Sequence, residues 1–172
     1  MTLFENVGGR LRGAHSSWSA VDGAAVLIRG VLGFVFVAHG AQKLFGWFGG
    51  GGIDGTTGFF TSLGIPSPRF FAVLTGLTEF FGGILLLVGL LTVATSLALI
   101  VDMVLAIATF NHANGFFVES PNGGWELNFA LIGLLSGLTL IGAGSWSADN
   151  TIGLARADAT RTSRPPDLRA AR

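Results

Sequence analysis

The sequence contains no cysteine, and only 12% of its 172 residues are charged. The absence of cysteine excludes disulfides, thiol redox chemistry, thiolate zinc sites, cysteine-ligated iron–sulfur clusters and covalent c-type haem. A typical soluble domain has about 25% charged residues, so this chain has too little polar surface to cover a water-soluble globule. Half of its residues are hydrophobic, and the mean hydropathy is +0.64. The composition therefore predicts a membrane protein of one domain.

Long apolar runs divide the chain into four expected transmembrane helices. The expected spans are 24–45, 69–90, 92–110 and 126–142. Residues 70–110 are almost continuously apolar, and a single helix of that length would be about 60 Å long, twice the thickness of the membrane, so the chain must turn midway. We therefore predict an all-α fold, a four-transmembrane-helix bundle within residues 24–144.

The remaining segments are polar or rich in turn-forming residues. We expect a polar head at 1–23 without a cleavable signal peptide, so that the first span acts as an uncleaved anchor. Loops are expected at 46–68 and 111–125, and a disordered tail at 145–172. The head contains two arginines and the tail five, and four spans place both on one side of the membrane. The positive-inside rule then predicts a multi-pass protein of the inner (plasma) membrane with both termini in the cytoplasm.

Each expected span carries an ionisable group on a face of small residues. At about 100° per residue, one face of the first span holds Arg29, Gly33, Phe36, Gly40 and Lys43, with His39 at its edge. The corresponding faces of the other spans are Ala72, Gly76, Glu79 and Gly83; Thr95, Ala98, Asp102, Ala106, Thr109 and Ala113, with His112 alongside; and Glu126, Ala130, Gly133, Gly137 and Gly144. Small residues let membrane helices approach closely, so we expect all four faces to point inward.

Glu79 and Asp102 are expected to lie side by side near the bilayer centre. Each is about 11–12 residues, roughly 17 Å, from the expected hairpin. Two carboxylates this close in a low dielectric are not both ionised, so one should hold a proton or pair with Arg29, His39 or Lys43. Two interpretations stay open: a functional inner site, or acid–base pairs that lock the helix register while Arg29 and Lys43 snorkel.

Other motifs predict no site. Gly49–Gly52 reads as a flexible turn, because no phosphate-loop sequence follows it. A bis-histidine haem between His39 and His112 is geometrically possible, but we do not expect it, since isolated histidines usually serve other roles. No metal site is expected. The arginine-containing tail lacks interleaved aromatic residues, so we expect contact with membrane lipids and no nucleic-acid binding.

Several short motifs occur together in one order. They are Arg29, Gly33, Phe36, His39-Gly40 and Lys43-Leu44-Phe45-Gly46; Gly58-Phe59-Phe60 and Leu63-Gly64-Ile65-Pro66; Glu79, Gly82-Gly83 and Gly89-Leu90; Asn114-Gly115-Phe116-Phe117 and Trp125-Glu126-Leu127-Asn128; and Gly142 to Asp149. Over about 26–149 the chain thereby resembles the DoxX family of small bacterial and archaeal membrane proteins. The resemblance implies a four-helix inner-membrane protein, and the family takes its name from a subunit of a quinone-linked sulfur-oxidising oxidoreductase. Some relatives are associated with oxidative-stress defence. Asp102 does not stand out in the family pattern.

Three functions follow as hypotheses. The first is a membrane subunit of a quinone-linked oxidoreductase or oxidative-stress defence complex, whose electrons come from a partner protein. Its candidate catalytic residues are His39, Glu79, Lys43 and Asp102, and its candidate quinone-binding residues are Arg29, His39, Lys43 and Glu79. The second is a non-catalytic anchor or assembly partner for an extracytoplasmic protein. The third is a small lipid or metabolite carrier, which would require a homo-oligomer. The sequence leaves open whether the chain is an enzyme, and which substrate, partner or oligomeric state it has.

Overall fold

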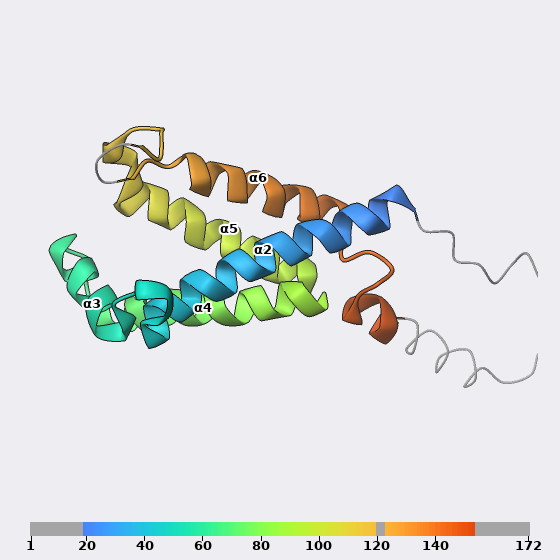
Figure 1. The fold of residues 1–172 in the computed structure, drawn as a ribbon, viewed down its shortest axis with the longest axis horizontal. Coiled ribbons are helices and arrows are strands. Elements are labelled where there is room, and N and C mark those ends of the chain that lie inside the picture. Colours follow the sequence, from blue (N-terminus) through green and yellow to red (C-terminus); the bar gives the residue numbers. More distant parts are fainter. Residues whose placement is uncertain (1–18, 120–122, 154–172) are drawn as a thin grey trace, which may run out of the picture.

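The computed structural model describes residues 19–119 and 123–153. Its α-helices are α2 (Ala20–Phe45), α3 (Gly52–Ser62), α4 (Pro68–Val88), α5 (Thr92–Thr109) and α6 (Glu126–Ile141), shown in Figure 1. Two short 3-10 helices, η2 (Trp47–Gly49) and η3 (Asn111–Asn114), lie in the connections. The described residues contain no β-strand.

Four apolar helices form a membrane bundle, as the sequence predicts. Helices α2, α4 and α5 have 26, 21 and 18 residues and are each long and apolar enough to cross a membrane, whereas α6 is a shorter apolar helix. The first helix begins four residues earlier than expected because Ser19 and Asp22 form a capping box. The Ser19 hydroxyl accepts a hydrogen bond of 3.0 Å from the backbone N–H of Asp22, which satisfies one of the free donors at the helix start.

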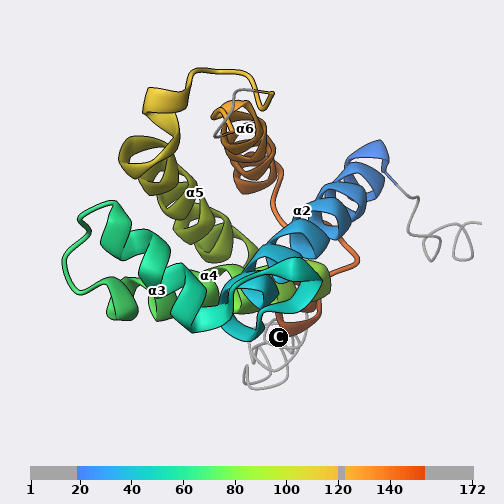
Figure 2. The same ribbon diagram turned by 60° about the vertical axis from the view of Figure 1, so that its left-hand side comes forward.

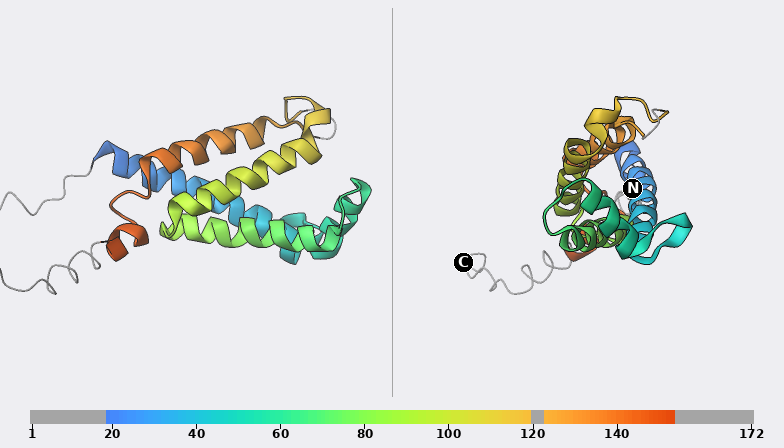
Figure 3. Two further views of the ribbon diagram at one scale, coloured as in Figure 1. Left: turned by 180° about the vertical axis from the view of Figure 1, so that it is seen from behind. Right: turned by 90° about the vertical axis from the view of Figure 1, so that its left-hand side faces the viewer.

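The helices surround a common core in the order α2, α4, α5, α6. Helices α2 and α4 make the most extensive contact, and α2 and α6 close the ring with the least extensive one; Figure 3 shows the arrangement along the bundle and end-on. Helices α4 and α5 form a hairpin in which Gly89 adopts a φ of 68°. The backbone N–H of Ser145 donates to Asp22 across 2.7 Å, so both ends of the described chain lie at the hairpin end. We call this the terminal end and the opposite end, with α3, the loop end. That the terminal end faces the cytoplasm stays a prediction.

Helices α2 and α4 pack backbone against backbone. A Cβ atom on Gly83 would lie 2.6 Å from the backbone nitrogen of Val37, and one on Gly33 would lie 2.8 Å from the carbonyl oxygen of Gly83. A Cβ atom on Gly40 would collide with the backbone of Phe80. The prediction that small residues of these two helices face inward is therefore confirmed.

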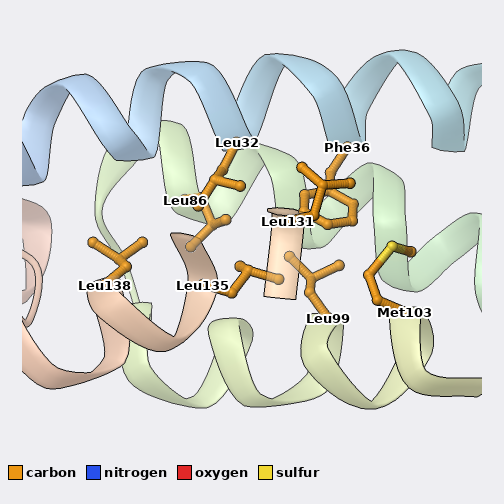
Figure 4. Close-up of a cluster of buried hydrophobic side chains, with 8 residues drawn as sticks. All are labelled: Leu32, Phe36, Leu86, Leu99, Met103, Leu131, Leu135 and Leu138. Atoms are coloured by element: carbon orange, nitrogen blue, oxygen red, sulfur yellow. The ribbon is translucent and has the colours of Figure 1, made fainter. Parts of the chain in front are cut away.

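The other half of the bundle is packed by bulky side chains. The core consists of Leu32, Phe36, Leu86, Leu99, Met103, Leu131, Leu135 and Leu138, and Figure 4 shows these side chains pointing toward one another. Three members of the core, Phe36, Met103 and Leu131, also line the cavity described below, so the core extends from the hairpin half of the bundle to the inner site.

The expected inward face of the fourth helix is wrong. Leucines 131, 135 and 138 point into the core, whereas Ala130 and Gly133 are exposed and no atom lies within 4 Å of a Cβ atom built on Gly133 or Gly137. On α5, Thr95 and Asp102 are buried as expected, but Ala98 and Thr109 are exposed. Glycine and leucine are both apolar, so polarity alone does not decide which of them faces lipid. The space that the tightly packed α2–α4 pair leaves for α5 and α6 decides which of their residues face inward.

The expected loop 46–68 contains a helix, α3, which the sequence interpretation missed. The hydroxyls of Thr56, Thr57 and Thr61 donate to carbonyls four residues earlier across 2.7–2.8 Å, as the geometry of a helical turn allows. Helix α3 packs against α4 and α2. Its Asp54 also pairs with Arg69 across 2.9 Å at the protein surface.

The prediction of a disordered tail over 145–172 is wrong for 145–153. The two carboxylate oxygens of Asp149 accept hydrogen bonds from the backbone N–H groups of Leu91 (2.7 Å) and Thr92 (2.9 Å). The backbone N–H of Asp149 donates to the carbonyl of Gly89 across 2.9 Å. Residues 148–153 are helical. This segment, which we call the strap (145–153), thus covers the α4–α5 hairpin. The head at 1–18 and the tail at 154–172 lie outside the described residues.

Candidate functional site

A cavity of about 570 Å³ occupies the loop half of the bundle. All five α-helices contribute to its wall, which is mainly phenylalanine, leucine and other apolar side chains. The ionisable or amide-bearing side chains in this wall are His39, Lys43, Glu79, Asp102 and Asn128. A mainly apolar cavity with a few convergent polar groups is the usual form of a small-molecule site.

Lys43 and Glu79 form an ion pair within this wall. The side chain of Glu79 is 4% exposed and that of Lys43 27% exposed, so the carboxylate is the more deeply buried partner. Close packing of α2 on α4 brings them together, since a Cβ atom on Gly76 would lie 2.7 Å from the side chain of Leu44. The pair therefore depends on glycine at the helix contact as well as on its own charges.

Asp102 adds a second carboxyl group from α5. Its residue is 9% exposed, and its carboxyl group lies close to that of Glu79 in the same cavity wall. Two carboxyl groups this close in a low dielectric are not both ionised, so one of them holds a proton. With the ammonium group of Lys43, one carboxylate and one carboxylic acid, the cluster carries no net charge. Such balance is what a low-dielectric membrane interior favours.

His39 lines the same cavity one helical turn from Lys43, but its side chain is exposed. Within the described part of the chain it forms no hydrogen bond or ion pair. Its imidazole therefore has both nitrogen atoms available to a ligand.

Arg29 does not belong to this site, contrary to the sequence interpretation. Its guanidinium group is buried, 3% exposed, at the terminal end, where Nη2 donates to the carbonyl of Trp146 across 2.6 Å. It is absent from the cavity wall. Arg29 and Lys43 share a helix face, as expected, but 14 residues of helix separate them by about 21 Å. Arg29 holds the strap, and the structure does not bring it to the cavity with His39, Lys43 and Glu79.

The strap carries an acid whose pKa the fold shifts. Burial raises the pKa of Asp149, but hydrogen bonds from Thr92 and Leu91 and the nearby charge of Arg29 outweigh it, so the pKa lies below its ordinary value. The ionised carboxylate thus caps the first turn of α5 and faces the positive end of that helix.

The sequence candidates did not include Phe59, Phe60 and Asn128 of the wall. Phe59 and Phe60 come from α3 and line the cavity, and they were missed with the helix that carries them. Asn128 lies in the first turn of α6 and donates to the sulfur of Met103 across 3.4 Å. An amide at the start of an apolar helix was the available signal for Asn128.

The structure tests the expectations about haem and metal only for the residues that it describes. The side chain of His112 lies outside what the structure describes, so the expectation that His39 and His112 hold no haem stays a prediction. Across residues 19–119 and 123–153, no three His, Asp or Glu side chains group as a metal site requires.

Comparisons with known proteins give two relatives and one family. The sequence model of the DoxX family matches residues 24–112, which include α2, α3, α4 and α5. "Uncharacterized membrane protein Rv3486" of Mycobacterium tuberculosis is 33% identical over 139 residues, 75% of this chain and 81% of that protein. "Putative oxidoreductase CatD" of Bacillus subtilis is 33% identical over 84 residues, 49% of this chain and 57% of that protein. No solved structure matches the chain significantly.

Proposed function

Because this chain belongs to the DoxX family of membrane proteins, we propose that it is the membrane subunit of a quinone-linked oxidoreductase and binds the quinone headgroup in its cavity. The observation that carries this proposal is the neutral cluster of Lys43, Glu79 and Asp102 in an otherwise apolar wall. A charge near the bilayer centre costs at least about 2.5–3.5 kcal/mol. A cluster of three ionisable groups at a cavity is therefore better explained by a ligand than by helix packing alone.

The shape and donors of the cavity fit a quinone headgroup. Its volume of about 570 Å³ falls within the range of roughly 300–1,000 Å³ that small-molecule sites occupy. Five phenylalanines line it and offer flat apolar contacts: Phe36, Phe59, Phe60, Phe71 and Phe110. The ammonium group of Lys43 and the imidazole of His39 are hydrogen-bond donors suited to carbonyl oxygens.

The residues around the cavity can also hold and move a proton. A quinone, when bound, supplies chemistry in which two electrons and two protons are taken up or released together. The proton held by Glu79 or Asp102 lies at the cavity wall. Lys43 already balances one carboxylate, so loss of this proton leaves one negative charge until another proton replaces it. His39, at the exposed edge, suits exchange of that proton with the surroundings.

Electrons must come from another protein. The sequence has no cysteine, so it cannot ligate an iron–sulfur cluster through thiolates. We propose an electron-donating partner subunit, with both proteins in the plasma membrane or at its surface. The Bacillus subtilis relative is named as a putative oxidoreductase, which supports the proposal that this chain also serves an oxidoreductase. A role in oxidative-stress defence falls within the same proposal.

Equilibrium binding of a short-chain ubiquinone to the purified protein in mild detergent tests this function. Glu79→Gln and Asp102→Asn should each weaken binding about tenfold, because each removes a charge or proton that the headgroup meets. Glu126→Gln is the matched control: Glu126 also lies on a bundle helix but not in the cavity wall, and its affinity should stay within about twofold of wild type. Absence of wild-type binding, or equal affinities in all three variants, would overturn the proposal.

A further inference from the structure

The cavity reaches the outer surface of the bundle between α2 and α6. His39 of α2 and Leu127 of α6 both line the cavity, and both are exposed, Leu127 to 47%. The two helices converge at the terminal end and diverge toward the loop end, as Figures 1 and 3 show. Their mutual contact is the least extensive around the ring. Exposed wall residues beside helices that diverge and touch little point to an opening between α2 and α6.

The other neighbouring helices of the ring are in closer contact than α2 and α6, although Leu105 on the α5 side of the wall is also exposed. Between α2 and α4 the glycine backbones are in contact, as described for Gly83 and Val37. Helix α3 packs against α4 and α2, and the ring of its Phe59 packs edge-on against Phe110, directly after α5, with centroids 4.8 Å apart. Between α5 and α6, Asn128 donates to Met103. Figure 2 shows α3 next to α4 and α5, on the other side of the bundle from the divergence of α2 and α6.

The position of His39 makes this opening unusual for a surface that faces lipid. It lies six residues before the end of α2, so its imidazole is about 9 Å inside the helix terminus. A polar ring in that position is unfavourable against hydrocarbon unless it meets a polar group. A headgroup entering the cavity would supply that group, while an apolar tail would fill the seam behind it.

We infer that the ligand of the cavity enters from the bilayer between α2 and α6, and that its tail stays in this seam beside His39 and Leu127. The inference rests on the proposed function and narrows the ligand to an amphiphile with a compact polar head and a long apolar tail. Water-soluble, tail-less analogues use only the inner part of the site. Leu127 is then a residue that controls entry and contacts the tail.

Rates of ligand exchange test the route separately from the site. Leu127→Trp should slow both association and dissociation of tritiated decylubiquinone about tenfold, measured by scintillation proximity on the protein in lipid nanodiscs. The equilibrium affinity should change much less, because a narrower route affects the transition state for entry more than the bound state. Leu127→Ala should bind at least as fast as wild type. Leu127 is half exposed, so both substitutions are compatible with folding.

Two matched substitutions locate the opening. Leu140→Trp places the same side chain on α6 at a position 87% exposed and outside the cavity wall, and should leave the rates unchanged. Leu105→Trp narrows the α4–α5 side of the cavity and should slow exchange far less than Leu127→Trp. A Leu127→Trp protein with wild-type rates, or a larger effect of Leu105→Trp, would overturn this inference alone. Absence of quinone binding by the wild type would overturn the proposed function and this inference with it.

Discussion

Lys43 of α2 and Glu79 of α4 form an ion pair inside the bundle, and this pair joins the most tightly packed helices of the fold to its cavity. Asp102 of α5 extends the pair to a third helix. The same three residues therefore fix the positions of three helices and present hydrogen-bonding groups to a ligand. Substitutions must separate these two roles, and the chain offers controls for each.

Breaking the pair from one side should destabilise the protein more than removing it altogether. Glu79→Gln alone leaves the ammonium group of Lys43 without its carboxylate, and loss of one partner of a buried pair costs up to about 3–5 kcal/mol. Lys43 is 27% exposed, so the lower end of that range is expected. The double variant Lys43→Met with Glu79→Gln should recover part of the loss, as measured by thermal unfolding in detergent. A double variant no more stable than Glu79→Gln alone would contradict this account.

Arg29 should affect the strap and not the cavity. Arg29→Gln removes the hydrogen bond to the carbonyl of Trp146, and the strap should become susceptible to limited proteolysis. Quinone affinity should stay within about twofold of wild type, because about 21 Å of helix separates Arg29 from Lys43. If Arg29→Gln folds but no longer binds quinone, Arg29 contributes to the quinone site after all.

Asp149 should stabilise the bundle in a pH-dependent way. Removal of its two capping hydrogen bonds in Asp149→Ala should cost about 0.5–2 kcal/mol of unfolding free energy at neutral pH. Because folding lowers the pKa of Asp149, this contribution is complete above the ordinary carboxyl pKa of 3.8. It is lost as the pH falls through the lower folded-state pKa.

The difference in stability between wild type and Asp149→Ala should therefore be largest at neutral pH and shrink below the ordinary carboxyl pKa. Asp54→Ala is the control, since the carboxylate of Asp54 is 88% exposed and its pair with Arg69 lies at the surface. Exposed pairs contribute about 0–1 kcal/mol. An Asp149→Ala protein as stable as Asp54→Ala at neutral pH would show that the cap is dispensable.

Glycine should be required where α2 and α4 touch and dispensable on α6. A Cβ atom on Gly83 would lie 2.6 Å from the backbone of Val37, so Gly83→Ala should cost about 1–3 kcal/mol through overpacking. Gly133→Ala meets no atom within 4 Å and should be neutral or stabilise the helix by up to about 1 kcal/mol. Melting temperatures of the two variants in one detergent test this directly; equal melting temperatures would contradict the proposed close packing.

The sequence predicted the apolar helices well because a helix that crosses a bilayer must be apolar over the thickness of the hydrocarbon layer. It also brought Glu79 and Asp102 together, because equal distance from a hairpin sets equal depth on antiparallel helices. It grouped Arg29 with Lys43 wrongly, because a shared face on a helical wheel says nothing about position along the axis. Position along the helix axis correctly placed Glu79 beside Asp102, and the same measure would have separated Arg29 from Lys43.

Helix α3 and the face of α6 could not be obtained from the pattern. The segment that forms α3 has three glycines among its eleven residues, and glycine weakens an isolated helix by about 1 kcal/mol per residue. Contacts with α4 and α2 supply what its propensity lacks. The face of α6 was ambiguous because lipid solvates leucine and glycine alike, so only the volume available beside Leu135 selected it.

The most direct test of the central claim is native mass spectrometry of the 17.8 kDa chain extracted from membranes in mild detergent. The account predicts an adduct of quinone mass on the wild-type protein and on Glu126→Gln, and its loss in Glu79→Gln and Asp102→Asn. A wild-type chain that carries no such adduct, or an adduct retained in both cavity variants, would contradict the assignment of the Lys43–Glu79–Asp102 cluster as a quinone site.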